Sequence, residues 1–144
     1  MTQRIEAPNE QDIDHIARLL IHAGELTNEV TGQPLSARLS DLPLLQQVLD
    51  AGVIEPEATY SLQSLGIAFG KVFVNCNEHY DWWMVEDEYG RDPAVRYKET
   101  SLLVFPQTMI SKRIEDGEDI QLPAFYENLV NQLEEIRAEN YAGD

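Results

Sequence analysis

The sequence predicts an α+β fold, with helices mainly on one face of a small antiparallel sheet. Apolar residues recur at helical spacing in the first half, alternate as in strands between residues 80 and 105, and return to helical spacing afterwards. We therefore expect three N-terminal helices, a three-stranded antiparallel meander and two C-terminal helices. The 144 residues fit a single domain covering residues 1–144, with no linker long enough to divide it.

Two helices are expected before residue 53. Residues 1–11 are polar, and we expect this segment to be frayed. The first helix begins at Asp12 and stops at Thr31-Gly32-Gln33-Pro34. The second opens at Ser40, a suitable cap, and ends at Gly52, where a left-handed residue is needed.

A third helix is predicted from Pro56, and its apolar residues lie on more than one side. Such a helix is central and buried. Gly66 and Gly70 are four residues apart on one of its faces, a spacing that lets another element approach the backbone closely. Close packing is therefore expected there.

Three strands and two further helices follow. The strands are predicted over Tyr80 to Glu86, Ala94 to Lys98 and Leu102 to Phe105, because these segments alternate or form short apolar runs. Pro106 starts the fourth helix and Leu122 starts the fifth, whose apolar residues again recur at helical spacing.

Composition restricts the function. The formal net charge is −16, from 26 acidic and 10 basic residues. Nucleic acids and anionic lipids carry the same sign, so neither is an expected partner, whereas a protein with a basic surface is. No apolar run is long enough for a signal peptide or a membrane span, so we expect no membrane contact and a cytoplasmic location.

The residue types that carry most catalysis are too few or too scattered to form a site. Cys76 and His79 form one Cys-x-x-His pair, but structural zinc needs four ligands. His15 and His22 share a helix face without histidines from a second helix. Nucleotide-binding and common hydrolase motifs are absent. We therefore predict no catalytic residue, no metal and no cofactor.

Two adjacent tryptophans are the first candidate for an interaction site. Trp82 and Trp83 lie in one predicted strand, so their side chains must point to opposite faces of the sheet. If helices cover only one face, one tryptophan marks the other face as an interaction surface. The alternative is that a helix or the first segment covers that face too.

Arg113 is the second candidate. It lies near the inward face of the fourth helix, where it can form a bidentate pair with a carboxylate from the sheet. Alternatively, it recognises an anion in a cleft between the sheet and the fourth helix, lined by Arg113, Tyr97 and Trp83.

Four short motifs carry a family resemblance. They are Leu65-Gly66-x-x-Phe69-Gly70, the Trp83 strand, Asp87-x-x-Gly90, and Phe105-Pro106-x-x-Met109-Ile110-x-Lys112-Arg113. In this order, over the second half of the chain, they resemble the bacterial domain-of-unknown-function family 3806. The resemblance implies a stand-alone α+β domain in a bacterial cytoplasm, and no activity, cofactor or catalytic residue.

The sequence favours a non-enzymatic protein-binding module, immunity-like or chaperone-like, and it is compatible with a homodimer. The alternative is a small enzyme or ligand-binding protein that uses the cleft beside the fourth helix. A third reading is mimicry of nucleic acid, but the acidic residues are spread through turns and helix ends rather than along one stripe.

Overall fold

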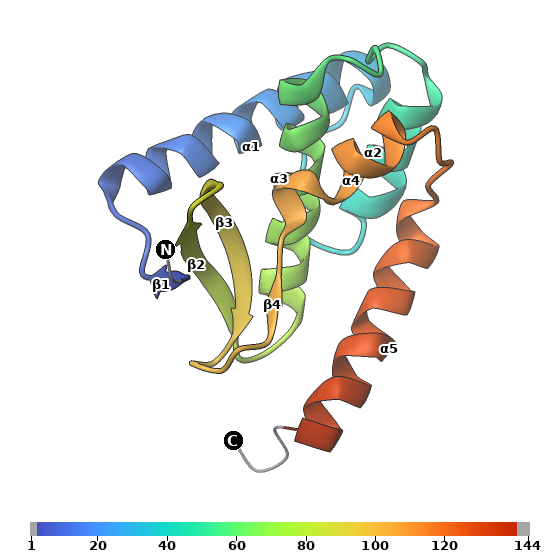
Figure 1. The fold of residues 1–144 in the computed structure, drawn as a ribbon. Coiled ribbons are helices and arrows are strands. Elements are labelled where there is room, and N and C mark those ends of the chain that lie inside the picture. Colours follow the sequence, from blue (N-terminus) through green and yellow to red (C-terminus); the bar gives the residue numbers. More distant parts are fainter. Residues whose placement is uncertain (1–2, 141–144) are drawn as a thin grey trace.

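The computed structural model describes residues 3–140 and has an α+β architecture (Figure 1). Helices and strands follow in the order β1 (Arg4–Glu6), α1 (Glu10–Thr31), α2 (Asp41–Asp50), α3 (Thr59–Cys76), β2 (Tyr80–Asp87), β3 (Gly90–Tyr97), β4 (Leu103–Val104), α4 (Pro106–Glu115) and α5 (Leu122–Asn140). The five predicted helices and the meander are present. The predicted order is incomplete, because a strand precedes the first helix.

The sheet has four antiparallel strands in the order β1-β2-β3-β4, so the prediction of three was wrong. The additional strand lies within the segment expected to be frayed, where Ile5 pairs with Val85 of β2. An ion pair of 2.5 Å between Arg4 and Glu86 fastens it. Three residues are too few for an alternating pattern, and the partner strand lies some 80 residues away.

β3 begins at Gly90, four residues before the predicted strand. The early part, Gly90 to Pro93, has no alternating apolar pattern but pairs with β2 as far as Asp87. Proline is tolerated at Pro93 because β4 pairs only with Val95 and Arg96, which leaves that side of β3 without a neighbouring strand.

α3 is the central helix, as its apolar composition predicted, and ten of its residues are buried. A Cβ atom at Gly70 would lie 2.7 Å from Pro106 Cγ and 2.7 Å from Trp82 Cη2. At Gly66, a Cβ would collide with the backbone carbonyl oxygen of Pro106. The predicted close packing at both glycines is therefore confirmed, and it brings the start of α4 against α3.

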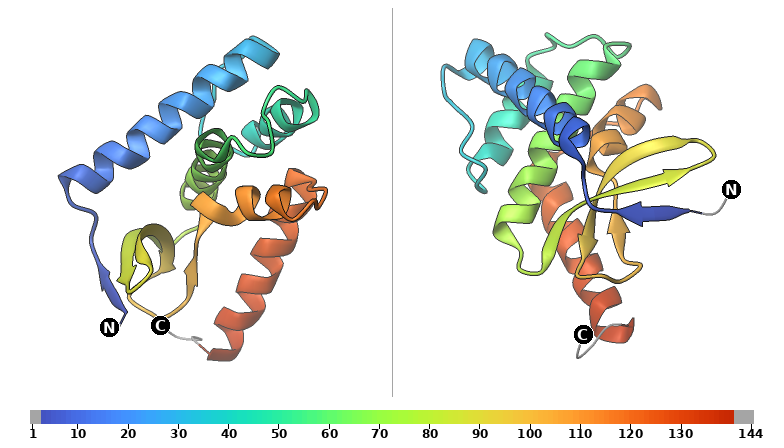
Figure 2. Two further views of the ribbon diagram at one scale, coloured as in Figure 1. Left: turned by 45° about the horizontal axis from the view of Figure 1, so that its top comes forward. Right: turned by 90° about the vertical axis from the view of Figure 1, so that its left-hand side faces the viewer.

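The helices gather on one side of a strongly curled sheet (Figure 2). α1 crosses α3, and α4 lies alongside α3 (Figure 1). The largest hydrophobic core joins α2, α3 and α5 to Val95, Tyr97 and Val104 of the sheet. The opposite face of the sheet carries Trp83 and Arg96, and it is called the outer face below.

Candidate functional site

The two tryptophans lie on opposite faces of β2, as the strand pattern predicted. Trp82 points to the helices, where it meets Gly70 and packs beside Ile16 and Ile67. Trp83 lies on the outer face, with the Arg96 guanidinium 4.6 Å from its ring centroid. The two rings therefore belong to separate environments.

The outer face is largely buried around the middle of β2 and β3. Val85 and Ala94 lie on this face, yet only 3% and 0% of their surfaces are exposed. Trp83 itself is half-buried beneath Arg96. Arg96 is fixed because its Nε donates a hydrogen bond of 2.6 Å to the Thr100 carbonyl oxygen. This face therefore offers little free apolar surface.

The proposed cleft beside the fourth helix does not bring its three residues together. Tyr97 is opposite Tyr80 in the sheet, and Tyr80 lies on the same face of β2 as Trp82. The Tyr97 side chain therefore faces the helices, whereas Trp83 faces away from them. Arg113 donates to the Met109 carbonyl oxygen and stacks 4.6 Å from the Phe125 ring centroid. The expected pair between Arg113 and a sheet carboxylate does not form within residues 3–140, because α5 lies over the arginine.

Arg91 joins three separate segments near the β2–β3 turn. Its guanidinium donates to Glu6 at 2.5 Å and to both oxygens of Asp12, at 3.1 and 2.6 Å. The Arg91 hydrogen bonds lower the pKa of Glu6 and of Asp12, and they raise the pKa of Arg91 itself. Asp12 and Asn9 also form a capping box at the start of α1. The network therefore fastens β1 and α1 to the hairpin.

An apolar groove runs along one side of α1, and sequence reasoning did not single it out. Two hollows of about 230 and 540 Å3 form it, and both are lined by Leu20 and Lys71. Trp82 lines the smaller hollow. Ile13 and Ile21 border the groove with 59% and 62% of their surfaces exposed. The helical spacing of the sequence could have indicated this groove, because five small or apolar residues share one helix face: Ile13, Ala17, Leu20, Ile21 and Gly24.

The far wall of the α1 groove is a loop held by one buried carboxylate. Asp41 accepts hydrogen bonds from the Ser36 backbone N–H, the Ser36 hydroxyl and the Ala37 backbone N–H, at 2.8, 3.0 and 2.7 Å. These bonds place Pro34 and Leu35 opposite α1. The groove is therefore built into the fold.

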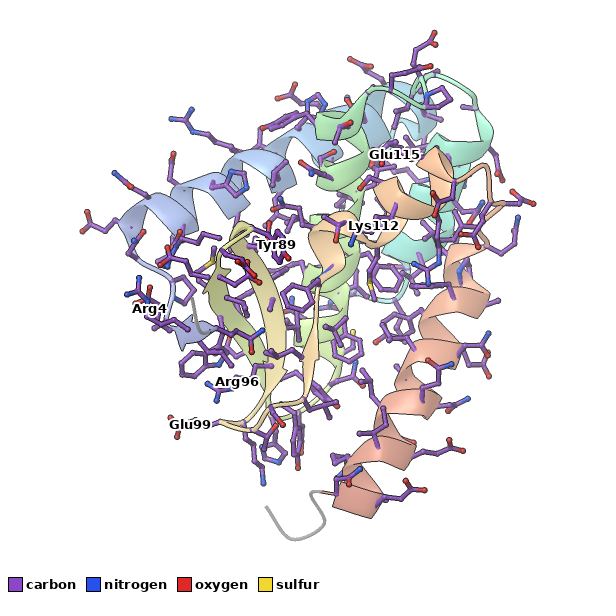
Figure 3. The ribbon with its side chains drawn as sticks, in the orientation of Figure 1. Arg4, Tyr89, Arg96, Glu99, Lys112 and Glu115 are labelled. Atoms are coloured by element: carbon purple, nitrogen blue, oxygen red, sulfur yellow. The ribbon has the colours of Figure 1, made fainter. Side chains whose placement is uncertain are left out.

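A separate hollow of about 260 Å3 lies between the open end of the β2–β3 hairpin and α5. Its walls include Phe73, His79, Tyr80, Tyr97 and Arg137, and it is called the Tyr97 pocket below. Figure 3 places this end of the hairpin by Glu99, far from the turn at Tyr89. Tyr97, which was predicted to line a cleft, does line a pocket, but the helix that covers this pocket is α5 rather than α4.

Basic groups surround the Tyr97 ring. Lys98 Nζ is 5.4 Å from its centroid, Arg137 Cζ is 5.7 Å away, and the His79 ring lies at 6.3 Å. Burial raises the pKa of the neighbouring Tyr80 hydroxyl. That hydroxyl therefore stays protonated at neutral pH and is available as a donor.

α5, which closes the Tyr97 pocket, is anchored at its first residue. The Leu122 backbone N–H donates to the Gln46 side-chain oxygen at 2.6 Å. The Gln46 amide nitrogen in turn donates to the Ile120 carbonyl oxygen at 3.2 Å. A single buried glutamine of α2 thus fixes the start of the helix that carries Arg137.

Two other classes of site are absent from residues 3–140. In this part of the chain, no group of three or more His, Cys, Asp or Glu side chains is arranged to hold a metal ion. None of the described helices is both long and apolar enough to cross a membrane. Cys76 is exposed at the end of α3.

Comparisons with known proteins agree with this architecture. A family model described as "Domain of unknown function (DUF3806)" matches residues 41–126. A crystal structure from Bacteroides thetaiotaomicron VPI-5482 matches with a TM-score of 0.85 and 17% sequence identity, covering 92% of this chain and 48% of that one. This chain therefore spans about half the length of that protein, and the likeness concerns the fold alone. No curated protein matches the sequence.

Proposed function

The chain belongs to the DUF3806 family, and we propose that it is a non-enzymatic protein-binding domain whose α1 groove holds a partner with a basic surface. The observation that carries the proposal is the exposure of Ile13 and Ile21 beside two hollows that share Leu20 and Lys71 in their walls. Apolar side chains gathered at a groove mark interaction sites, whereas single exposed apolar residues do not. An amphipathic or extended segment fits such a groove.

Charge supports a basic partner. The exposed positions of α1 include Glu10, Asp14, Glu25 and Glu29, and the helix has one arginine, Arg18, which pairs with Asp14 at 2.8 Å. Together with the net charge of −16, these carboxylates attract a cationic surface and speed association at low ionic strength.

The chemistry of the shifted carboxylates also favours binding over catalysis. Glu6 and Asp12 have a lowered pKa because Arg91 donates hydrogen bonds to them. Both serve to hold β1 and α1 in place, so their shifts have a structural cause.

Substitution at the groove tests the proposal. Ile21→Glu places a carboxylate at the groove edge, and Val53→Glu is the matched control, because Val53 is 57% exposed outside the groove. The partner is captured from extract of the source organism, purified, and titrated with each variant by calorimetry. We expect Ile21→Glu to weaken binding at least roughly tenfold, Val53→Glu to change it little, and added salt to weaken it.

Two outcomes contradict the proposal: a partner bound equally by the Ile21→Glu variant, or an affinity that ionic strength does not change. A concentration-dependent homodimer disrupted by Ile21→Glu would make a second copy the occupant instead. The type of partner separates the two finer readings. Inhibition of a folded basic toxin favours an immunity-like role, and binding to an unfolded basic segment favours a chaperone-like role.

A further inference from the structure

We propose that the Tyr97 pocket binds a small organic monocarboxylate with a flat apolar body. This site is separate from the α1 groove, and the two share no lining residue. Its walls, its charge and its backbone conformation all suit such a ligand.

The walls suit a flat apolar group. Phe73 and Tyr80 meet edge to face with ring centroids 4.9 Å apart, and Tyr80 and Tyr97 lie 5.2 Å apart. Leu133 and Val130 of α5 close the opposite side. The volume of about 260 Å3 is below that of sites for drug-sized molecules, roughly 300–1,000 Å3, so the ligand must be small.

The charge suits one carboxylate. The chain has only 10 lysines and arginines against 26 acidic residues, yet Arg137 lines this pocket, and Lys98, which is not among its lining residues, approaches the same Tyr97 ring. Within residues 3–140, neither forms an ion pair. Arg96 and Arg113 also lie over aromatic rings without a carboxylate partner among the described residues, but of these three arginines only Arg137 lines the Tyr97 pocket. A guanidinium without a carboxylate partner at the edge of an apolar pocket is a recognition group for a carboxylate.

Two acidic residues limit the ligand to a single negative charge. Glu78 and Glu134 line the same pocket, and Glu134 lies one helical turn before Arg137 on α5. A second carboxylate on the ligand would meet these side chains, so dianions are disfavoured. The Tyr80 hydroxyl remains a neutral donor for the bound carboxylate.

The backbone is held in an unfavourable conformation at this site. His79 and Lys98 have φ angles of 71° and 49°, and they are two of the three non-glycine residues with positive φ among residues 3–140. They are joined by a hydrogen bond of 2.8 Å from the Lys98 N–H to the His79 carbonyl oxygen. Such conformations cluster at binding sites, where they fix the direction of side chains.

Titration with benzoate, followed by calorimetry and by NMR of the aromatic side chains, tests the inference. We expect saturable binding with a dissociation constant in the millimolar range and shifted tyrosine signals. Benzamide, which has the same shape without the charge, and phthalate, which has two charges, should bind at least several-fold more weakly.

The variant for this test is Arg137→Gln, with Arg38→Gln as the matched control, since Arg38 is exposed and outside the pocket. Arg137→Gln should weaken benzoate binding roughly tenfold or more, and Arg38→Gln should leave it unchanged. Thermal unfolding of both variants verifies that they remain folded. Ile21→Glu should still bind benzoate, so failure of the groove proposal would not affect this one.

Three results would overturn the inference: no saturable benzoate binding to the wild-type protein, benzamide binding as tightly as benzoate, or an affinity unchanged by Arg137→Gln. Because the first two use the wild-type protein, the test stands even if a variant is unstable.

Discussion

The two ends of the β2–β3 hairpin hold their positive charges in different ways. At the turn, Arg91 contacts the carboxylates of Glu6, Asp12 and Glu86. At the open end, Arg137 and Lys98 lie against the ring of Tyr97, without an ion pair in the described part of the chain. The charge of Arg91 thus holds segments of the chain together, whereas the charges of Arg137 and Lys98 are left available to a ligand.

The largest expected difference between the two ends is in stability. Arg91→Gln removes the donors of the buried Asp12 carboxylate, so we expect the free energy of unfolding to fall by about 2 kcal/mol. Arg137→Gln should change it by less than about 0.5 kcal/mol, because no ion pair in the described residues is lost. Urea unfolding at neutral pH measures both. If both variants lost the same free energy of unfolding, Arg91 would not differ from Arg137 in its role in stability.

Acid should erase the contribution of Arg91. The folded-state pKa of Glu6 and of Asp12 is lowered from 4.5 and 3.8, so their stabilisation is present above these values and is lost as pH falls through the lower folded values. The stability difference between wild type and Arg91→Gln should therefore shrink from about pH 5 downward. Urea unfolding at a series of pH values measures it, and a pH-independent difference would show that the charges are not responsible.

The smallest expected effect concerns the backbone at the open end. His79→Gly relieves a left-handed conformation and should raise the free energy of unfolding by up to about 1 kcal/mol. Glu78→Gly is the matched control, because Glu78 is exposed and its φ is not positive, and it should lower stability by about 0.5–1 kcal/mol. Similar losses in both variants would mean that His79 is not strained.

Local patterns in the sequence were sufficient for much of the fold. Helical spacing located all five helices, and alternation placed Trp82 and Trp83 on opposite faces. The spacing of Gly66 and Gly70 predicted their close packing correctly. β1 was missed because its stability comes from pairing with β2 and from Arg4, neither of which is visible in a three-residue segment.

The candidate site was harder to predict because its parts are distant in sequence. Arg91 meets Asp12 across 79 positions, and no local spacing encodes that contact. Tyr97 was predicted to line a cleft, but α5 rather than α4 covers it, and the hydrogen bonds that hold α5 come from Gln46 and Asn77, which are 76 and 49 positions from their partners. The α1 groove was not predicted because the spacing of apolar residues does not show which of them stay exposed, as Ile13 and Ile21 do.

Because Gln46 holds α5 at its first residue, the tilt of this helix determines how far Arg137 lies from Tyr97, and therefore how wide the Tyr97 pocket is. Arg137 lies fifteen residues beyond Leu122, which corresponds to about 22 Å along the helix axis. Each degree of tilt at the anchored end therefore displaces the guanidinium by roughly 0.4 Å. The hydrogen bond of 2.8 Å from Asn77 Nδ2 to the Tyr126 hydroxyl and the burial of Leu133 hold α5 further along its length, so they limit this tilt and with it the thickness of a ligand that the pocket admits.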